Sequence, residues 1–265
     1  MGNLSFLATS DGASLAYRLD GAAEKPLLAL SNSIGTTLHM WDAQLPALTR
    51  HFRVLRYDAR GHGASSVPPG PYTLARLGED VLELLDALEV RRAHFLGLSL
   101  GGIVGQWLAL HAPQRIERLV LANTSAWLGP AAQWDERIAA VLQAEDMSET
   151  AAGFLGNWFP PALLERAEPV VECFRAMLMA TNRHGLAGSF AAVRDTDLRA
   201  QLARIERPTL VIAGAYDTVT AASHGELIAT SIAGARLVTL PAVHLSNVEF
   251  PQAFEGAVLS FLGAA

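Results

Sequence analysis

The sequence predicts an α/β protein with a mainly parallel central sheet, helices on both faces of the sheet, and a helical insertion. Two observations lead to this prediction. Short apolar runs alternate with helical patterns in the first and last parts of the chain, whereas the middle part contains helical patterns only. Apolar strands that alternate with helices are typical of a parallel sheet covered on both faces. The 265 residues are enough for one such domain with an insertion.

Six short apolar runs are the expected strands, at 27–30, 54–57, 95–98, 119–122, 210–213 and 237–240. Helical patterns lie between several of these runs, at 74–88, 102–111, 223–231 and 251–261. In the first of these helices, apolar residues recur every three or four positions and form one face. Asp11-Gly12 separates two further strand-like stretches, 4–9 and 14–18, and therefore predicts an opening hairpin.

The stretch from about Trp127 to Leu198 breaks this alternation. Its helical patterns, punctuated by Pro160-Pro161 and Gly185, cover 131–143, 149–158, 163–181 and 186–193. An all-helical insertion between two strands of a parallel sheet is typical of a cap, which covers the place where substrate enters. We therefore expect a core formed by residues 1–125 and 197–265, and a cap formed by residues 126–196.

The composition restricts partners and location. A net charge of −6 argues against nucleic acid, which requires a basic face. The uncharged stretch 93–110 contains several glycines, and a buried strand followed by a buried helix explains it better than a membrane span. No signal peptide is recognised, and a lone cysteine, Cys173, excludes an intrachain disulfide. We expect a cytoplasmic protein in which Cys173 is packed and unreactive; the oligomeric state cannot be predicted.

Residues 97–101, Gly-Leu-Ser-Leu-Gly, match the G-x-S-x-G pattern of a nucleophile elbow. The pattern alone is common, but here a strand-like run precedes Ser99 and a helical pattern follows it, as the elbow requires. The sharp turn demands residues almost without side chains two positions before and after the serine, and Gly97 and Gly101 meet that demand. The sequence therefore predicts an α/β-hydrolase fold with Ser99 as nucleophile.

A serine nucleophile needs a base and an acidic partner, which follow it in this fold in the order acid, histidine. His244 is the predicted base, because it alone among the later histidines follows the last strand-like run within a short loop. Asp217 is the predicted acid, since it comes just after the strand at 210–213. Its rivals are Asp195 and Asp197, which no strand precedes, and Glu249, which lies too close after His244.

Two backbone N–H groups must form the oxyanion hole. Leu100, directly after the nucleophile, should provide one of them. The other should come from the loop after the strand at 27–30, where Ile34 is the predicted donor and a one-residue shift would make it Ser33. Neither a metal nor an organic cofactor is required by this chemistry.

Several segments resemble the 3-oxoadipate enol-lactonases, bacterial α/β-hydrolases of aromatic-compound degradation. The resemblance lies in the loop 31–41, in the run 57–65, in the elbow and in residues 244–249. The loop 31–41 is the most specific of these, whereas the run 57–65 and the elbow occur in many α/β-hydrolases, and a histidine such as His62 is usually structural there. One departure is Val243, where the family pattern usually has glycine.

The resemblance implies hydrolysis of 3-oxoadipate enol-lactone, a small lactone that carries a carboxylate. Such a substrate requires a cation, and the predicted cap helix 131–143 offers one. Its residues Trp134, Arg137, Ile138 and Val141 share one face, on which Arg137 could pair with the carboxylate and Trp134 could contact the ring. The same pattern also fits an ordinary amphipathic helix with a solvated arginine and a packed tryptophan.

Other functions on the same fold remain open. A carboxylesterase, a perhydrolase or a carbon–carbon bond hydrolase would use the same three residues. A haloalkane dehalogenase is disfavoured, because its chemistry places a carboxylate where Ser99 stands. A ligand-binding receptor could retain the fold without catalysis, and turnover of any ester would exclude it.

Overall fold

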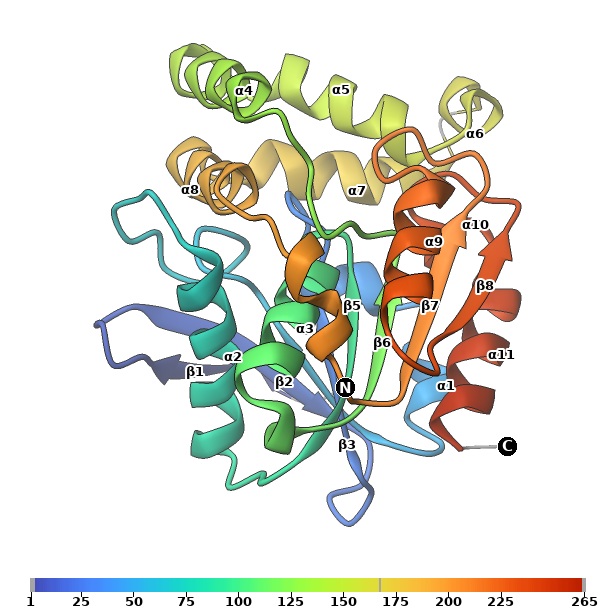
Figure 1. Cartoon of the computed structure of the whole chain (residues 1–265). Coiled ribbons are helices and arrows are strands. Elements are labelled where there is room, and N and C mark those ends of the chain that lie inside the picture. Colours follow the sequence, from blue (N-terminus) through green and yellow to red (C-terminus); the bar gives the residue numbers. More distant parts are fainter. Residues whose placement is uncertain (1–2, 167, 264–265) are drawn as a thin grey trace.

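The sheet of the computed structural model, which describes residues 3–166 and 168–263, has eight strands in the order β1-β2-β4-β3-β5-β6-β7-β8 (Figure 1). The strands are β1 (Ser5–Ala8), β2 (Ser14–Asp20), β3 (Leu27–Ser31), β4 (Arg53–Tyr57), β5 (Ala93–Leu98), β6 (Ile116–Ala122), β7 (Thr209–Gly214) and β8 (Arg236–Leu240). Strand β2 is antiparallel to both β1 and β4, and all neighbours from β4 to β8 are parallel. The predicted strands and the opening hairpin are confirmed.

Helices cover both faces of the sheet (Figure 1). On one face lie α2 (Leu74–Ala87), α3 (Leu100–His111) and α9 (Ala222–Ser231); on the other lie α1 (Leu45–Leu48) and α11 (Pro251–Leu262). Neighbouring strand residues point to opposite faces, so that Phe95 packs in one core cluster and Leu96 in the other. Both faces are apolar for this reason, which explains why the strands appear in the sequence as uninterrupted apolar runs.

Among the described residues, five α-helices lie between β6 and β7: α4 (Ala131–Gln143), α5 (Ser148–Trp158), α6 (Pro161–Glu165), α7 (Pro169–Ala180) and α8 (Arg183–Arg194). In Figure 1 they form a separate layer beyond the end of the sheet. The chain enters and leaves this layer at neighbouring points. Trp127 and Asp197 form an antiparallel bridge, and the Leu198 N–H donates to the Ala126 carbonyl at 2.9 Å.

Two expectations were wrong in this helical layer. The single helix expected over 163–181 is divided, because Pro169 lacks a backbone N–H and therefore begins a helix instead of continuing one. Cys173 is exposed and not packed. The buried face of α7 is formed by Val171, Phe174 and Leu178, and Cys173 lies outside that face.

The uncharged stretch 93–110 becomes strand β5 and most of helix α3, as expected. Across the described part of the chain, no helix combines the length and the apolar character that a membrane crossing would need.

Candidate active site

Ser99 occupies the sharp turn between β5 and α3. Its backbone φ of +58° lies in a region that residues other than glycine rarely adopt. Two hydrogen bonds hold the turn: the Ser99 N–H donates to the Ala122 carbonyl at 3.0 Å, and Thr124 Oγ1 donates to the Ser99 carbonyl at 2.7 Å. The conformation presents the Ser99 side chain to a cavity at the end of the sheet.

The two glycines of the elbow are required by close backbone approaches. A Cβ atom on Gly97 would lie 2.1 Å from the Gly101 carbonyl oxygen, and one on Gly101 would lie 2.2 Å from the Ser31 carbonyl oxygen. Both neighbours are backbone atoms and cannot rotate away. The spacing of the G-x-S-x-G pattern is therefore a steric requirement of this turn.

This crowding predicts a large difference between two glycine variants. Gly97→Ala should lower the free energy of unfolding by about 1–3 kcal/mol, because the new methyl group overpacks the elbow. Gly156→Ala is the matched control: a Cβ there meets nothing within 4 Å, and alanine should stabilise helix α5 by about 0.5–1 kcal/mol. Urea denaturation of both variants measures the difference, and equal effects would contradict the steric explanation.

His244 and Asp217 come from the loops that follow β8 and β7, and they meet at the end of the sheet. His244 Nδ1 lies 2.9 Å from Asp217 Oδ2, and both side chains are almost completely buried. Ser99 and His244 line the same cavity. The structure therefore brings together the three residues that the sequence singles out, on a strand-to-helix turn and two loops far apart in the chain.

The Asp217 carboxylate accepts hydrogen bonds on both oxygens. Oδ1 accepts from the backbone N–H groups of Val219 at 2.8 Å and Thr220 at 2.9 Å. Oδ2 accepts from Thr220 Oγ1, from Asn123 Nδ2 and from His244. Burial alone would raise the pKa of Asp217, but the charge and hydrogen bond of His244 and the Thr220 bonds lower it to about 2. The ionised carboxylate keeps the proton of a neutral His244 on Nδ1 and leaves Nε2 free to act as a base.

The rival acids have other partners. Asp195 pairs with Arg194, and Asp197 pairs with Arg199, in both cases at the surface. Glu249 accepts a hydrogen bond from the Val243 N–H at 2.8 Å and so holds the loop that carries His244. Among the described residues, none of the three acids is hydrogen-bonded to the His244 imidazole.

His62 supports the loop after β3. Its Nε2 accepts a hydrogen bond from the Gly35 N–H at 3.0 Å, and its Nδ1 donates to the Arg60 carbonyl at 3.2 Å. Burial lowers the pKa of His62, which favours the neutral ring that this arrangement needs. His111 is also outside the site, where it stacks on Trp107 at the end of α3.

The structure favours Ile34 over Ser33 as the second oxyanion donor. The Ser33 N–H points to the Met40 sulfur at 3.3 Å, and Ser33 does not line the cavity. The N–H groups of Ile34 and Leu100 have no acceptor among the described residues, and both residues line the cavity. Asn32 locks the loop against the elbow, because its carbonyl accepts from the Gly101 N–H at 3.0 Å.

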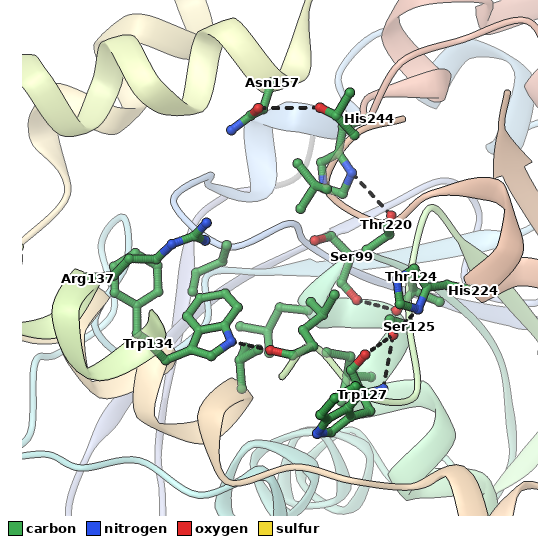
Figure 2. Close-up of a pocket in the computed structure, with 18 of the residues that line it drawn as sticks. Ser99, Thr124, Ser125, Trp127, Trp134, Arg137, Asn157, Thr220, His224 and His244 are labelled. Carbon is green, nitrogen blue, oxygen red and sulfur yellow. Dashed lines mark hydrogen bonds between the residues drawn. The ribbon is translucent and has the colours of Figure 1, made fainter. Parts of the chain in front are cut away.

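The cavity has a volume of about 310 Å³ and lies between the sheet and the helical layer. Figure 2 shows Trp134 and Arg137 on one side of it and Ser99 and His244 on the other. The Arg137 guanidinium stacks over the Trp134 ring at 4.8 Å. Within the described residues Arg137 has no carboxylate partner, so its charge is available to a ligand.

The cavity residues that the sequence analysis missed include His224 and Asn157. His224 lines the cavity, and its Nδ1 lies 2.9 Å from Ser125 Oγ. Ser125 donates its one proton to the Trp127 carbonyl, so His224 must donate to Ser125. Asn157 lines the cavity from α5, although its sequence position suggested only an amphipathic helix. The position of His224 soon after Asp217 could have indicated that His224 lies near the cavity. No sequence signal indicates the place of Asn157.

Comparison with known proteins shows the family of this chain. Residues 26–161 match the family described as alpha/beta hydrolase fold. The chain belongs to the α/β-hydrolase family. It is 42% identical over 250 residues to 3-oxoadipate enol-lactonase 2 of Acinetobacter baylyi, covering 94% of this chain and 93% of that protein.

Two solved structures of α/β-hydrolases are very similar. A hydrolase from Pseudomonas aeruginosa PA01 has a TM-score of 0.99 and 99% identity, with 99% of each chain covered. The enol-lactonase from Burkholderia xenovorans LB400 has a TM-score of 0.95 and 42% identity, covering 98% of this chain and 100% of that one. The predicted fold and the resemblance to the enol-lactonases are confirmed, and the protein is a hydrolase of the lactonase type.

Proposed function

We propose that this protein hydrolyses 3-oxoadipate enol-lactone to 3-oxoadipate, with Ser99 as nucleophile, His244 as general base and Asp217 as its partner. The observation that carries the proposal is one cavity in which Ser99 and His244 face Arg137, an arginine with no carboxylate partner in the described part of the chain. Similarity over 94% of the chain to a protein named as an enol-lactonase supports the substrate.

Ring opening follows from the arrangement of these groups. Ser99 Oγ attacks the lactone carbonyl carbon while His244 Nε2 takes the hydroxyl proton. The N–H groups of Ile34 and Leu100 donate to the carbonyl oxygen as it becomes negative. The ring C–O bond then breaks, and the oxygen leaves as an enolate that takes the proton from His244 Nε2 and becomes the ketone. The acyl group stays on Ser99.

Water completes the reaction. His244 Nε2 accepts a proton from a water molecule, whose oxygen attacks the acyl carbon. The second tetrahedral intermediate uses the same two N–H donors, and its collapse returns the proton to Ser99 Oγ. The product carboxylate is released, and no further reactant is consumed.

The helical layer would provide substrate recognition. We propose that residues 126–196 form a cap domain on a core of residues 1–125 and 197–265, in a cytoplasmic enzyme. In this arrangement Trp134 contacts the lactone ring, and Arg137 pairs with the carboxylate through its planar guanidinium. The cation lies on the cap and the nucleophile on the core, so binding and chemistry depend on different parts of the chain.

Arg137→Ala should mainly weaken the binding of the acidic lactone. We expect KM to rise about 10- to 100-fold with kcat little changed, as for the loss of one charged hydrogen-bonded contact. The control is a neutral ester of equal size, for which both constants should stay within about twofold of wild type. An unchanged KM for the lactone would exclude Arg137 as the carboxylate anchor.

The proposed substrate is tested directly by comparing kcat/KM for the enol-lactone and for that neutral ester. A strong preference for the lactone is expected from the wild-type enzyme. Equal turnover of both would point to a general carboxylesterase, and turnover of neither would contradict the proposed function.

A further inference from the structure

Asn123 is a buried polar residue that the reaction steps above do not use. It directly follows β6, is about 1% exposed, and has a φ of +42°, in the left-handed region. Asparagine tolerates this conformation better than most residues. Its backbone N–H donates to the Ile212 carbonyl at 2.8 Å, which fixes its position against β7.

Every polar position of the Asn123 side chain is used. Nδ2 donates to Asp217 Oδ2 at 3.1 Å and to the Val243 carbonyl at 3.2 Å. Oδ1 accepts from Ser246 Oγ at 2.5 Å. Only an amide offers two donated protons and one acceptor in this shape. One side chain thus connects the loop of the acid, the residue before the base, and the short helix α10 (Ser246–Glu249) after the base.

The space around this amide is closed by backbone. A Cβ atom on Gly214 would lie 2.6 Å from the carbonyl oxygens of Ala242 and Val243, and 2.9 Å from Asn123 Nδ2. The two loops therefore approach each other closely at the point where Asn123 connects them, and the contacts of its amide are direct.

We propose that Asn123 is a positioning residue of the reaction, which sets the distance and orientation between Asp217 and His244. It donates to the same Asp217 oxygen that faces His244 Nδ1, and it binds the carbonyl directly before His244. Movement of either loop would lengthen one of the two hydrogen bonds that Asn123 Nδ2 donates. The inference rests on the proposed roles of Asp217 and His244.

The Asn123→Gly variant removes the amide side chain but should keep the backbone conformation, so that the effects of the two can be told apart. Glycine adopts a positive φ more easily than asparagine, so the turn itself should be retained. If the amide positions the pair, kcat should fall about 10- to 100-fold with KM within about twofold, as for a small misplacement of reacting groups. A wild-type kcat in a folded Asn123→Gly variant would overturn the proposal.

Asn123→Asp keeps the shape but replaces both donors by an acceptor with negative charge. The added charge beside Asp217 favours the protonated form of His244, so the acid limb of the kcat/KM profile should move up by about one pH unit. The other titratable groups near the pair, His224 and Glu249, are the same in both proteins. An unmoved acid limb would contradict the proposal, even if Asn123→Gly fails to fold.

Each variant is assayed with the enol-lactone and with the neutral ester. A positioning effect must reduce kcat for both substrates, since the same pair acts on each. Loss of activity towards the lactone alone would contradict the proposal for Asn123. If the wild type hydrolyses the ester but not the lactone, the proposed substrate fails while Asn123 can still be tested on the ester.

Discussion

Ser99→Ala is expected to reduce kcat for the enol-lactone by roughly five to six orders of magnitude, because the only atom removed is the attacking oxygen. The fold should be retained. The contacts that hold the elbow are made by the backbone of Ser99, which donates to Ala122 and accepts from Thr124, and alanine keeps both. Single-turnover kinetics and urea denaturation together measure the two effects. A variant with wild-type activity would exclude Ser99 as the nucleophile.

Ser99→Gly is the informative companion variant. It also lacks the nucleophile, but glycine adopts the positive φ of the elbow without strain. Its free energy of unfolding should therefore be about 1 kcal/mol higher than that of Ser99→Ala. A gain in stability together with a loss of activity would indicate that the strained turn serves catalysis. Equal stability of the two variants would contradict strain at this position.

Asp217→Asn is expected to reduce kcat about 10⁴-fold while KM changes little. The amide oxygen should replace Oδ1, since that position accepts two backbone N–H groups, from Val219 and Thr220. The NH₂ group then faces His244 Nδ1, which must give up its proton to accept a hydrogen bond. The proton moves to Nε2, and the base loses the lone pair that should deprotonate Ser99.

Asp195→Asn is the matched control for this variant. Asp195 lies at the surface and pairs with Arg194, so its kcat should stay within about twofold of wild type. Steady-state kinetics of the two variants compare the same chemical change at the two candidate acids. A larger loss at Asp195 than at Asp217 would reverse the assignment of the acid.

The sequence predicted those parts of the structure that depend on local patterns. Apolar runs placed the strands, and the order of Ser99, Asp217 and His244 along the chain placed them all at one end of the sheet. The elbow was predictable because sterics permit only glycine at positions 97 and 101.

What the sequence missed depends on side-chain directions and on contacts between distant segments. The amphipathic pattern of 163–181 continues past Pro169, and only the backbone requirement of proline divides it. Asn123 is 94 positions from Asp217 and 120 from Val243, so nothing near it in the sequence indicates what it binds. Asn157 lines the cavity together with Ser99 although the two residues are far apart in the sequence.

The bridge between Trp127 and Asp197 holds the start and the end of the helical layer side by side. Because the chain leaves the sheet after β6 and returns towards β7 at these paired residues, the distance that the helical layer must span at its base is short. A change in the length of a helix within the layer leaves that connection between β6 and β7 as it is. The wall of the cavity that carries Trp134 and Arg137 can therefore change without moving the strands that precede Ser99, Asp217 and His244.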